Sequence, residues 1–311
     1  MNKLTYIVLV NYNSYKDTLE CIESFKKSLT QDYCIFIVDN KSTDDSIAKI
    51  KSNLKNESFI DINDDESIED FRKYKYILIK SKDNKGFASG NNKALRRIID
   101  HNLDGYVWVL NNDTIIRNDS LVNLKNDIEE NMFLGAVLVD YENKSRVQTI
   151  GGFLLKDIIG TPIKIGKGIN INQINEFKFK DPETLSGASI FMTTNTLRKV
   201  GLIPEEYFMY WEDTDWCFNA KNNDICLKTC LNAIVFHKEG ASIGYKSNKQ
   251  YILDFSNTLR FYTKYNEKYV KYIKYTKLMI NVISAIKNKQ NVIGVIKASR
   301  DGIIEFKRKR Y

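Results

Sequence analysis

The chain has 311 residues, of which 43% are hydrophobic and 28% charged, a composition typical of a globular protein that excludes a disordered or fibrous one. The net charge of +8 is unevenly distributed, because residues 246–311 hold 16 Lys and Arg against 4 acidic residues, whereas the rest holds 31 against 35. The first 245 residues therefore lack the basic face that nucleic-acid binding needs, and we expect no nucleic-acid partner.

Short apolar runs alternate with segments of helical spacing over the first 110 residues. The pattern predicts strands at 6–10, 35–38, 76–79 and 106–110, separated by helices at 15–27, 44–54 and 90–99. Continuous apolar strands alternating with helices predict an α/β fold with a Rossmann-like, mostly parallel sheet covered on both faces. Such sheets bind ligands at the carboxyl ends of their strands.

The later segments have other patterns. Residues 57–70 carry seven acidic side chains and predict a solvated loop without a site, and residues 146–180 predict irregular strands and hairpins. From about residue 251 the pattern is helical. We therefore expect a catalytic domain at 1–245, with a nucleotide-binding half at 1–113 and an acceptor half at 114–245, followed by a basic helical extension at 246–311.

Six short segments carry the chemistry. They are 8–13 (VLVNYN), 37–42 (IVDNKS), 84–92 (NKGFASGNN), 110–113 (LNND), 186–188 (SGA) and 210–216 (YWEDTDW). In this order they resemble the inverting family 2 glycosyltransferases, in particular the bacterial rhamnosyltransferase-like branch. The resemblance implies the GT-A fold, a nucleotide diphosphate sugar donor, and a Mg²⁺ or Mn²⁺ cofactor.

The donor is expected to bind where these segments meet. Asp39, at a strand end, can accept a hydrogen bond from the N3–H of a pyrimidine, which favours uridine or thymidine donors; the alternative is a helix N-cap or a turn carboxylate. Gly86 and Gly90 bracket a turn into a helix whose N-terminus favours an anion. The other donor-binding residues that the resemblance implies are Val10, Asn11, Tyr12, Asn84, Phe87, Asn91, Asn111, Asn112, Gly187 and Ala188.

The metal-binding residues implied by the resemblance are Asp113 and His237. A carboxylate suits Mg²⁺ or Mn²⁺, and diphosphate oxygens and waters can complete the shell. The family usually has a second Asp where this chain has Asn111, so we expect the metal to arrive with the nucleotide. Asn219 and Ser256 also stand where the family often has Arg, and the cations that could compensate are Lys85, Lys221 and Arg260.

The acidic cluster at 212–215 is the predicted catalytic centre. Direct displacement needs a base to take the proton of the acceptor hydroxyl. By resemblance this base is Asp213, with Glu212 and Asp215 shaping its position; the alternative is a solvated helix start. Trp211, together with Asp215, is expected to contact the acceptor, although Trp211 and Trp216 are equally compatible with core packing.

The expected reaction is transfer of a sugar from dTDP-rhamnose or a UDP-hexose to a saccharide or lipid-linked oligosaccharide in cell-surface polysaccharide synthesis. A sugar nucleotidyltransferase is the alternative within enzymes, but the first loop, residues 11–15, lacks the glycines that hold a triphosphate. A catalytically silent sugar-binding or scaffold protein is the alternative outside enzymes.

The C-terminal extension and the cysteines bear on location. The five cysteines lack CxxC spacing, and no apolar stretch approaches the ~18 residues of a transmembrane helix, which favours a cytoplasmic protein. The basic extension carries tyrosines at 262, 265, 269 and 272 and isoleucines at 283, 286, 293 and 296, all at helical spacings. This pattern predicts peripheral attachment to the anionic inner face of the cell membrane; packing on the catalytic domain or a homodimer interface is the alternative.

Overall fold

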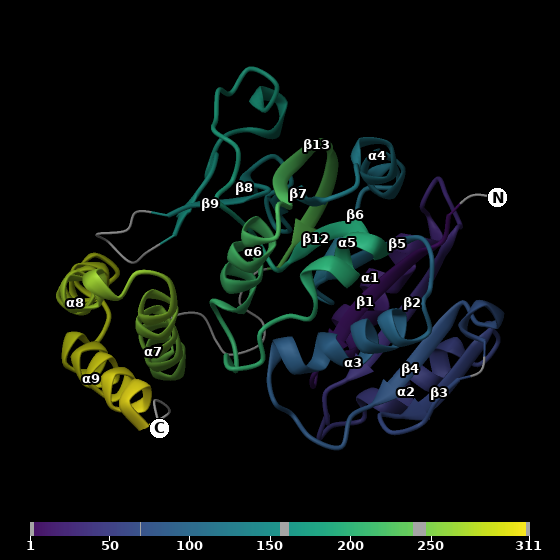
Figure 1. Ribbon diagram of the computed structural model, residues 1–311, viewed down its shortest axis with the longest axis horizontal. Helices are drawn as coiled ribbons and strands as arrows, with labels where there is room; N and C mark the ends of the chain where they lie inside the picture. Colours follow the sequence, from purple (N-terminus) through teal and green to yellow (C-terminus); the bar gives the residue numbers. More distant parts are fainter. Residues whose placement is uncertain (1–2, 69, 156–161, 239–246, 309–311) are drawn as a thin grey trace.

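The computed structural model describes residues 3–68, 70–155, 162–238 and 247–308. Its centre is a ten-stranded sheet in the order β3-β4-β2-β1-β5-β12-β7-β13-β6, with β8 paired to β7 (Figure 1). The strands are β1 Thr5–Asn11, β2 Tyr33–Asp39, β3 Phe59–Asn63, β4 Tyr76–Lys80, β5 Tyr106–Leu110, β6 Thr114–Ile116, β7 Met132–Asp140, β8 Val147–Ile150, β12 Ser189–Thr193 and β13 Cys226–His237. A second, three-stranded sheet consists of β9 Gly152–Leu154, β10 Ile163–Lys164 and β11 Thr184–Leu185.

Helices cover both faces of the large sheet. They are α1 Tyr15–Lys26, α2 Ser46–Leu54, α3 Phe87–Asp100, α4 Ser120–Asp127, α5 Thr194–Val200 and α6 Glu212–Asn222. Two apolar cores result, and the strands contribute alternate residues to each: Tyr6 and Val8 of β1 face one core, Ile7 and Leu9 the other. Burial on both faces is the reason why these strands are continuous apolar runs, as predicted.

The strand directions divide the sheet in two. Strands β3, β4, β2, β1 and β5 are all parallel, whereas β12 is antiparallel to both β5 and β7. Because β1, β2 and β5 run the same way, the residues that follow them gather at one edge of the sheet. The predicted mostly parallel α/β architecture is confirmed, with antiparallel strands added in the second half.

The prediction of a loop at 57–70 is wrong in part. Residues Phe59–Asn63 form β3, an edge strand parallel to β4, and Ile62 is buried. The carboxylate of Asp61 accepts hydrogen bonds from Lys51 (2.9 Å) and Lys80 (2.8 Å), so its charge is neutralised by neighbouring elements. The acidic composition of this segment is typical of a solvated loop. The strand was not predicted because the lysines that pair with Asp61 lie elsewhere in the sequence.

The C-terminal extension is helical, as predicted: α7 Asn248–Tyr265, α8 Val270–Lys287 and α9 Val292–Arg308. The three helices pack on one another at one end of the molecule (Figure 1). A third apolar core joins Phe255 and Phe261 of α7 to Tyr207 and Trp211, so α7 is attached to the loop that precedes α6. The predicted domain boundary at 245/246 lies outside the described residues. Within them, no helix is long and apolar enough to cross a membrane.

Candidate active site

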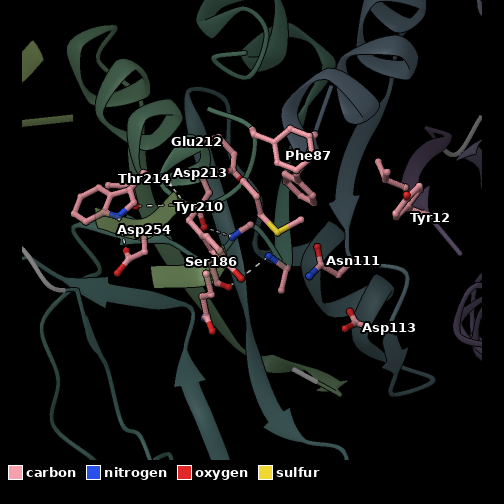
Figure 2. A pocket seen from close by; sticks show the side chains of 18 of the residues that line it. Tyr12, Phe87, Asn111, Asp113, Ser186, Tyr210, Glu212, Asp213, Thr214 and Asp254 are labelled. Atoms are coloured by element: carbon pink, nitrogen blue, oxygen red, sulfur yellow. Dashed lines mark hydrogen bonds between the residues drawn. The ribbon is translucent and has the colours of Figure 1, made fainter. Parts of the chain in front are cut away.

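A cavity of about 450 Å³ opens where the predicted motifs meet (Figure 2). Its walls come from the ends of β1 and β5, from the start of α3, from residues 186–188 and 208–214, and from the first turns of α7. Side chains that are distant in sequence therefore face one space. Asp113 and His237 lie on one side of it, and Glu212 and Asp213 belong to the loop and helix start on another.

Asp213 lies in the first turn of α6 and is held by backbone donors. Its Oδ2 accepts a hydrogen bond from the N–H of Gly187 (2.8 Å) and its Oδ1 one from the N–H of Thr214 (2.7 Å). A Cβ at position 187 would lie 3.1 Å from the Cβ of Asp213, so a glycine there permits this close approach. Burial raises the pKa of Asp213, although these hydrogen bonds oppose the shift. A carboxylate with a raised pKa is a stronger base than an ordinary one.

Glu212 precedes Asp213 and is the more buried of the two. Burial and the charge of Asp213 raise its pKa well above the ordinary value. Its Oε2 has no hydrogen-bond partner among the described residues, and the residue lines the cavity. An unpartnered buried oxygen at a cavity wall is suited to hydrogen bonding with a bound hydroxyl.

The backbone before α6 is strained. Tyr210 (φ 72°) and Trp211 (φ 77°) are consecutive non-glycine residues with positive φ. Asn257 of α7 donates from Nδ2 to the carbonyl oxygens of Met209 (2.9 Å) and Tyr210 (3.1 Å). Residues in this region of φ,ψ space persist only where the surroundings hold them, and they are common at active sites. Helix α7 thus fixes the loop that presents Glu212 and Asp213.

Asp113, in the turn after β5, and His237, at the end of β13, come together, with Nε2 of His237 3.4 Å from Oδ1 of Asp113. Gln148 fixes the imidazole through Nδ1 (3.1 Å), and Asn111 Nδ2 lies 3.4 Å from Nε2. Burial by itself would raise the pKa of Asp113, but the interactions with His237, together with a backbone hydrogen bond and the charge of Lys238, hold the pKa below its ordinary value. Asp113 is therefore an anion at neutral pH.

This pair fits a divalent cation in part. Asp113 and His237 supply an oxygen and a nitrogen ligand, and Oδ1 of Asp113 has no hydrogen-bond donor among the described residues. No group of three or more His, Cys, Asp or Glu side chains within the described ranges could hold a metal. Two protein ligands leave most of the coordination shell of the metal to other groups. This is expected because Asn111 stands where the family usually has a second Asp.

Comparison with known proteins identifies the family of this chain. Residues 6–199 match the model of glycosyl transferase family 2, which is more than half of the chain. The chain belongs to glycosyl transferase family 2. It is therefore an enzyme of the glycosyltransferase class.

Relatives of this family 2 member include a low-salt glycan biosynthesis hexosyltransferase of Haloferax volcanii, 23% identical over 242 residues, which are 75% of this chain and 76% of the relative. Among solved structures, a mannosyltransferase of Pyrobaculum calidifontis in complex with GDP-Man and Mn²⁺ matches 100% of this chain and 77% of its own (TM-score 0.59, 11% identity). A structure of GalNAc-T7 with UDP, GalNAc and Mn²⁺ matches 99% of this chain and 56% of the GalNAc-T7 chain (TM-score 0.65, 10% identity). These structures share the GT-A fold, which confirms the predicted fold.

Most of the predicted site residues of this family 2 enzyme line the cavity. On the donor and metal side they are Val10, Tyr12, Asn84, Gly86, Phe87, Asn111, Asn112, Asp113, Gly187, Ala188 and His237, and on the α6 side Trp211, Glu212 and Asp213. Gly86 has φ +97°, and a Cβ there would lie 1.9 Å from the carbonyl oxygen of Phe208. The glycine is thus required by the approach of the 208 loop rather than by a ligand.

Three predicted donor residues, Asn11, Asp39 and Asn91, do not line the cavity, and each is fully buried. Asp39 accepts from Asn11 Nδ2 (2.9 Å) through Oδ2 and from the N–H of Ser42 (2.9 Å) through Oδ1. This placement does not support the predicted contact between Asp39 and a base, because both oxygens already have donors and no surface is exposed. Asn11 and Asp39 instead join the ends of β1 and β2, and Asn91 donates from Nδ2 to the carbonyl oxygen of Phe87 within α3.

Asp215 requires a correction as well. It lies on the side of α6 away from the cavity, with a fully buried carboxylate that accepts from Tyr207 Oη (2.7 Å), Tyr265 Oη (2.6 Å) and Lys264 Nζ (2.9 Å). A carboxylate with three protein partners and no exposure cannot contact an acceptor. It binds α6 to α7. Trp216 is core, fully buried beside Phe133.

The contribution of α7 to the cavity was not predicted from the sequence. Lys249, Gln250 and Asp254 line the cavity, and Lys249 is the one Lys or Arg among its described lining residues; the predicted compensating cations Lys85, Lys221 and Arg260 do not line it. Asp254 accepts from the indole N–H of Trp211 (3.0 Å) and pairs with the buried Lys277 of α8 (2.7 Å). The available signal was a tryptophan inside a catalytic motif, whose N–H needs a partner when buried.

Proposed function

We propose that the enzyme transfers a sugar by direct, inverting displacement from a nucleotide diphosphate donor to the hydroxyl of an acceptor. Asp213 takes the hydroxyl proton, the acceptor oxygen bonds to the anomeric carbon, and the bond to the diphosphate breaks with its electron pair on the leaving phosphate. The observation that carries the proposal is the position of Asp213: a basic carboxylate, anchored through backbone N–H groups, that lines the same cavity as the anionic Asp113.

The donor is proposed to bind along the strand ends. Asp113 and His237 would hold Mg²⁺ or Mn²⁺ there, and the metal would offset charge that develops on the leaving diphosphate. The Mn²⁺ in the mannosyltransferase and GalNAc-T7 structures supports a divalent ion. Lys249 adds a second positive charge from α7. Because the protein supplies two ligands, we propose that metal and nucleotide bind together.

The donor sugar and the acceptor are finer proposals. We propose dTDP-rhamnose or a UDP-hexose as donor, with GDP-mannose as the comparison, since similar structures contain GDP-Man and UDP-GlcNAc. The acceptor is proposed to be a saccharide or a lipid-linked oligosaccharide at the cytoplasmic face of the membrane. The glycan biosynthesis hexosyltransferase relative supports a role in glycan biosynthesis.

A second candidate is a sugar-binding protein without turnover, which Asn111 favours because it replaces a charged metal ligand with an amide. The Glu212–Asp213 pair argues against it. Two adjacent carboxyls, one buried and one partly buried, cost stability, and a catalytic role explains why they are retained.

A panel of nucleotide sugars, each with and without Mn²⁺, tests both candidates. A true donor should raise the melting temperature only when Mn²⁺ is present, since a ligand that binds the native state alone stabilises it. Adding an acceptor should then release nucleotide diphosphate. Binding without release for every acceptor would favour the silent protein, and equal stabilisation by all donors would remove the proposed donor preference.

A further inference from the structure

The exposed apolar side chains of this protein are concentrated on two helices. Of the twelve large hydrophobic residues that are exposed within the described ranges, eight belong to α8 and α9. We call these eight the apolar strip: Tyr272, Tyr275, Met279, Ile283, Ile286, Ile293, Ile296 and Ile304. Their exposed fractions run from 39% to 68%. A group of this kind marks an interaction surface, whereas isolated exposed apolar residues are ordinary.

The part of the strip on α8 is one continuous face. Its members follow one another by three, four, four and three residues, which is the spacing of one side of a helix. The buried residues of α8 are Ile273, Lys277, Asn281 and Ala285, four apart and on the opposite side. Helix α8 therefore already has a packed inner face, and its outer face is a second apolar surface.

Helix α9 repeats this arrangement with positive charge added. Its inner face includes Gly302, where a Cβ would lie 2.9 Å from the carbonyl oxygen of Ile252 in α7. Its exposed residues combine isoleucines with basic side chains, namely Ile293, Ile296, Lys297, Arg300, Ile304 and Lys307, and include one acid, Asp301. The strip is thus bordered and interrupted by cations.

The tyrosines expected to face a membrane divide between the two sides. Tyr262 is buried, and Tyr265 and Tyr269 pack against the core that joins α7 to Trp211. Tyr272 is 63% exposed and belongs to the strip. Packing on the catalytic domain therefore accounts for α7, and the outer faces of α8 and α9 need another explanation.

The charge of these two helices selects the partner. Residues 270–308 contain nine Lys and Arg against Asp301 and Glu305, a net charge of +7. In a dimer through this strip the same positive charges would face one another, which disfavours a second copy. Nucleic acid would neutralise the charge but leave the isoleucines in water. An anionic bilayer surface offers phosphates to the cations and acyl chains to the isoleucines.

We propose that the apolar strip of α8 and α9 binds the surface of an anionic membrane, with the two helices lying in the interface. Lys277, on the inner face of α8, pairs with Asp254, which lines the cavity, so the membrane-bound helices are fixed directly to the acceptor side. Such an orientation brings a lipid-linked acceptor to the cavity; this last step rests on the proposed function, whereas membrane binding does not.

The test is co-sedimentation of the full chain with vesicles of phosphatidylglycerol and phosphatidylcholine, compared with vesicles of phosphatidylcholine alone. Binding should require the anionic lipid. It should fall at least tenfold between about 50 and 500 mM salt, because interactions between exposed charges become screened over this range. The triple variant Ile283→Gln, Ile286→Gln, Ile293→Gln should bind more than tenfold more weakly. Its matched control is Leu29→Gln, Ile163→Gln, Phe177→Gln, three exposed apolar residues outside the two helices, which should bind normally.

A charge test is independent of the apolar one. Lys297→Gln with Arg300→Gln should weaken binding about tenfold or more, whereas Lys178→Gln with Lys180→Gln removes the same charge from the catalytic domain and should not. Melting curves and nucleotide release with a soluble acceptor, measured on the same samples, separate this result from the proposed reaction. The proposal is overturned by equal binding to neutral vesicles, by no binding to anionic vesicles at low salt, or by a dimer that the triple variant abolishes.

Discussion

Asp113 and Asp213 line the same cavity from different elements: Asp113 follows β5, and Asp213 lies in the first turn of α6. Burial acts on both carboxylates in the same direction and favours the neutral acid. At Asp113 the neighbouring His237, a backbone hydrogen bond and the charge of Lys238 together outweigh burial, and the pKa is lowered. At Asp213 the donors are backbone and hydroxyl groups without full charge, burial prevails, and the pKa is raised.

This difference separates two kinds of chemistry within one space. The strand-end side holds a permanent negative charge, which suits a cation and the diphosphate it accompanies. The α6 side holds carboxyls that bind protons more readily, which suits proton abstraction from an acceptor. Each side depends on different supports: β13 and Gln148 for His237, and α7 for the loop before α6.

The largest effect should come from Asp213→Asn. The amide is nearly isosteric and keeps one oxygen for a backbone donor, but it cannot take a proton, so turnover should fall by about 10²–10⁴-fold with nucleotide binding retained. Asp215→Asn is the contrasting control, because its buried carboxylate joins α6 to Lys264 and the main loss should be in melting temperature. Turnover of Asp213→Asn within threefold of the unmodified enzyme would remove the assignment of the base.

Asp113→Ala should have the next largest effect, on the other side of the cavity. Removing the anionic ligand should abolish the increase in nucleotide affinity caused by Mn²⁺, roughly 10–100-fold, and a chelator should produce the same affinity in the unmodified enzyme. Calorimetric titration with and without Mn²⁺ measures this. Asp104→Ala, at an exposed carboxylate, is the control. An unchanged Mn²⁺ effect in Asp113→Ala would mean that the ion binds elsewhere.

The sequence predicted the strand-end side better than the α6 side. Continuous apolar runs identified β1, β2, β4 and β5, and the polar residues that follow parallel strands necessarily gather at one edge. Asp39 was predicted to contact the base of the donor because a carboxylate at such an edge resembles a binding residue. Its pairing with Asn11 and Ser42 depends on side-chain packing, which the pattern does not contain.

On the α6 side, the helical spacing of Asp213 and Asp215 could have predicted that the two acids have different roles. Asp213 and Asp215 are two residues apart on a helix, about 200° around its axis, so one faces the cavity when the other faces away. The sequence indicated only that the N–H of Trp211 needs a partner; it could not identify Asn257, Asp254 or Lys249, because their contributions require α7 to pack against a loop some 40 residues earlier. Long-range packing of this kind has no local signature.

Asn257→Ala tests the support of the α6 side. It leaves the carbonyls of Met209 and Tyr210 without their donor next to two strained residues, which should lower the free energy of unfolding by about 1–3 kcal/mol in denaturant titrations. Asn288→Ala is matched, because Asn288 also donates to a backbone carbonyl but is exposed, and its effect should be within ~0.5 kcal/mol. Equal losses for the two variants would show that α7 does not support this loop.

Glu212→Gln should have the smallest effect, and its sign depends on pH. The ordinary pKa of Glu is 4.5, and the folded-state pKa of Glu212 lies well above it. As pH rises from 4.5 towards the folded-state pKa, the unfolded chain loses this proton while the native protein keeps it, so the stability contributed by protonated Glu212 is progressively lost. Glutamine does not ionise. The melting temperature of Glu212→Gln should therefore rise relative to that of the unmodified enzyme as the pH increases from 5 to 8. Glu205 provides the opposite case: burial would raise its pKa, but hydrogen bonds from Asn92 and Arg96 hold it below the ordinary value of 4.5. The stability that ionised Glu205 contributes therefore develops as the pH rises through its folded-state pKa to about 4.5, so the melting temperature of Glu205→Gln should fall relative to that of the unmodified enzyme below pH 5 and keep a constant difference from it between pH 5 and 8. Melting curves of the two variants that shift in the same direction would contradict the opposite protonation of these two acids.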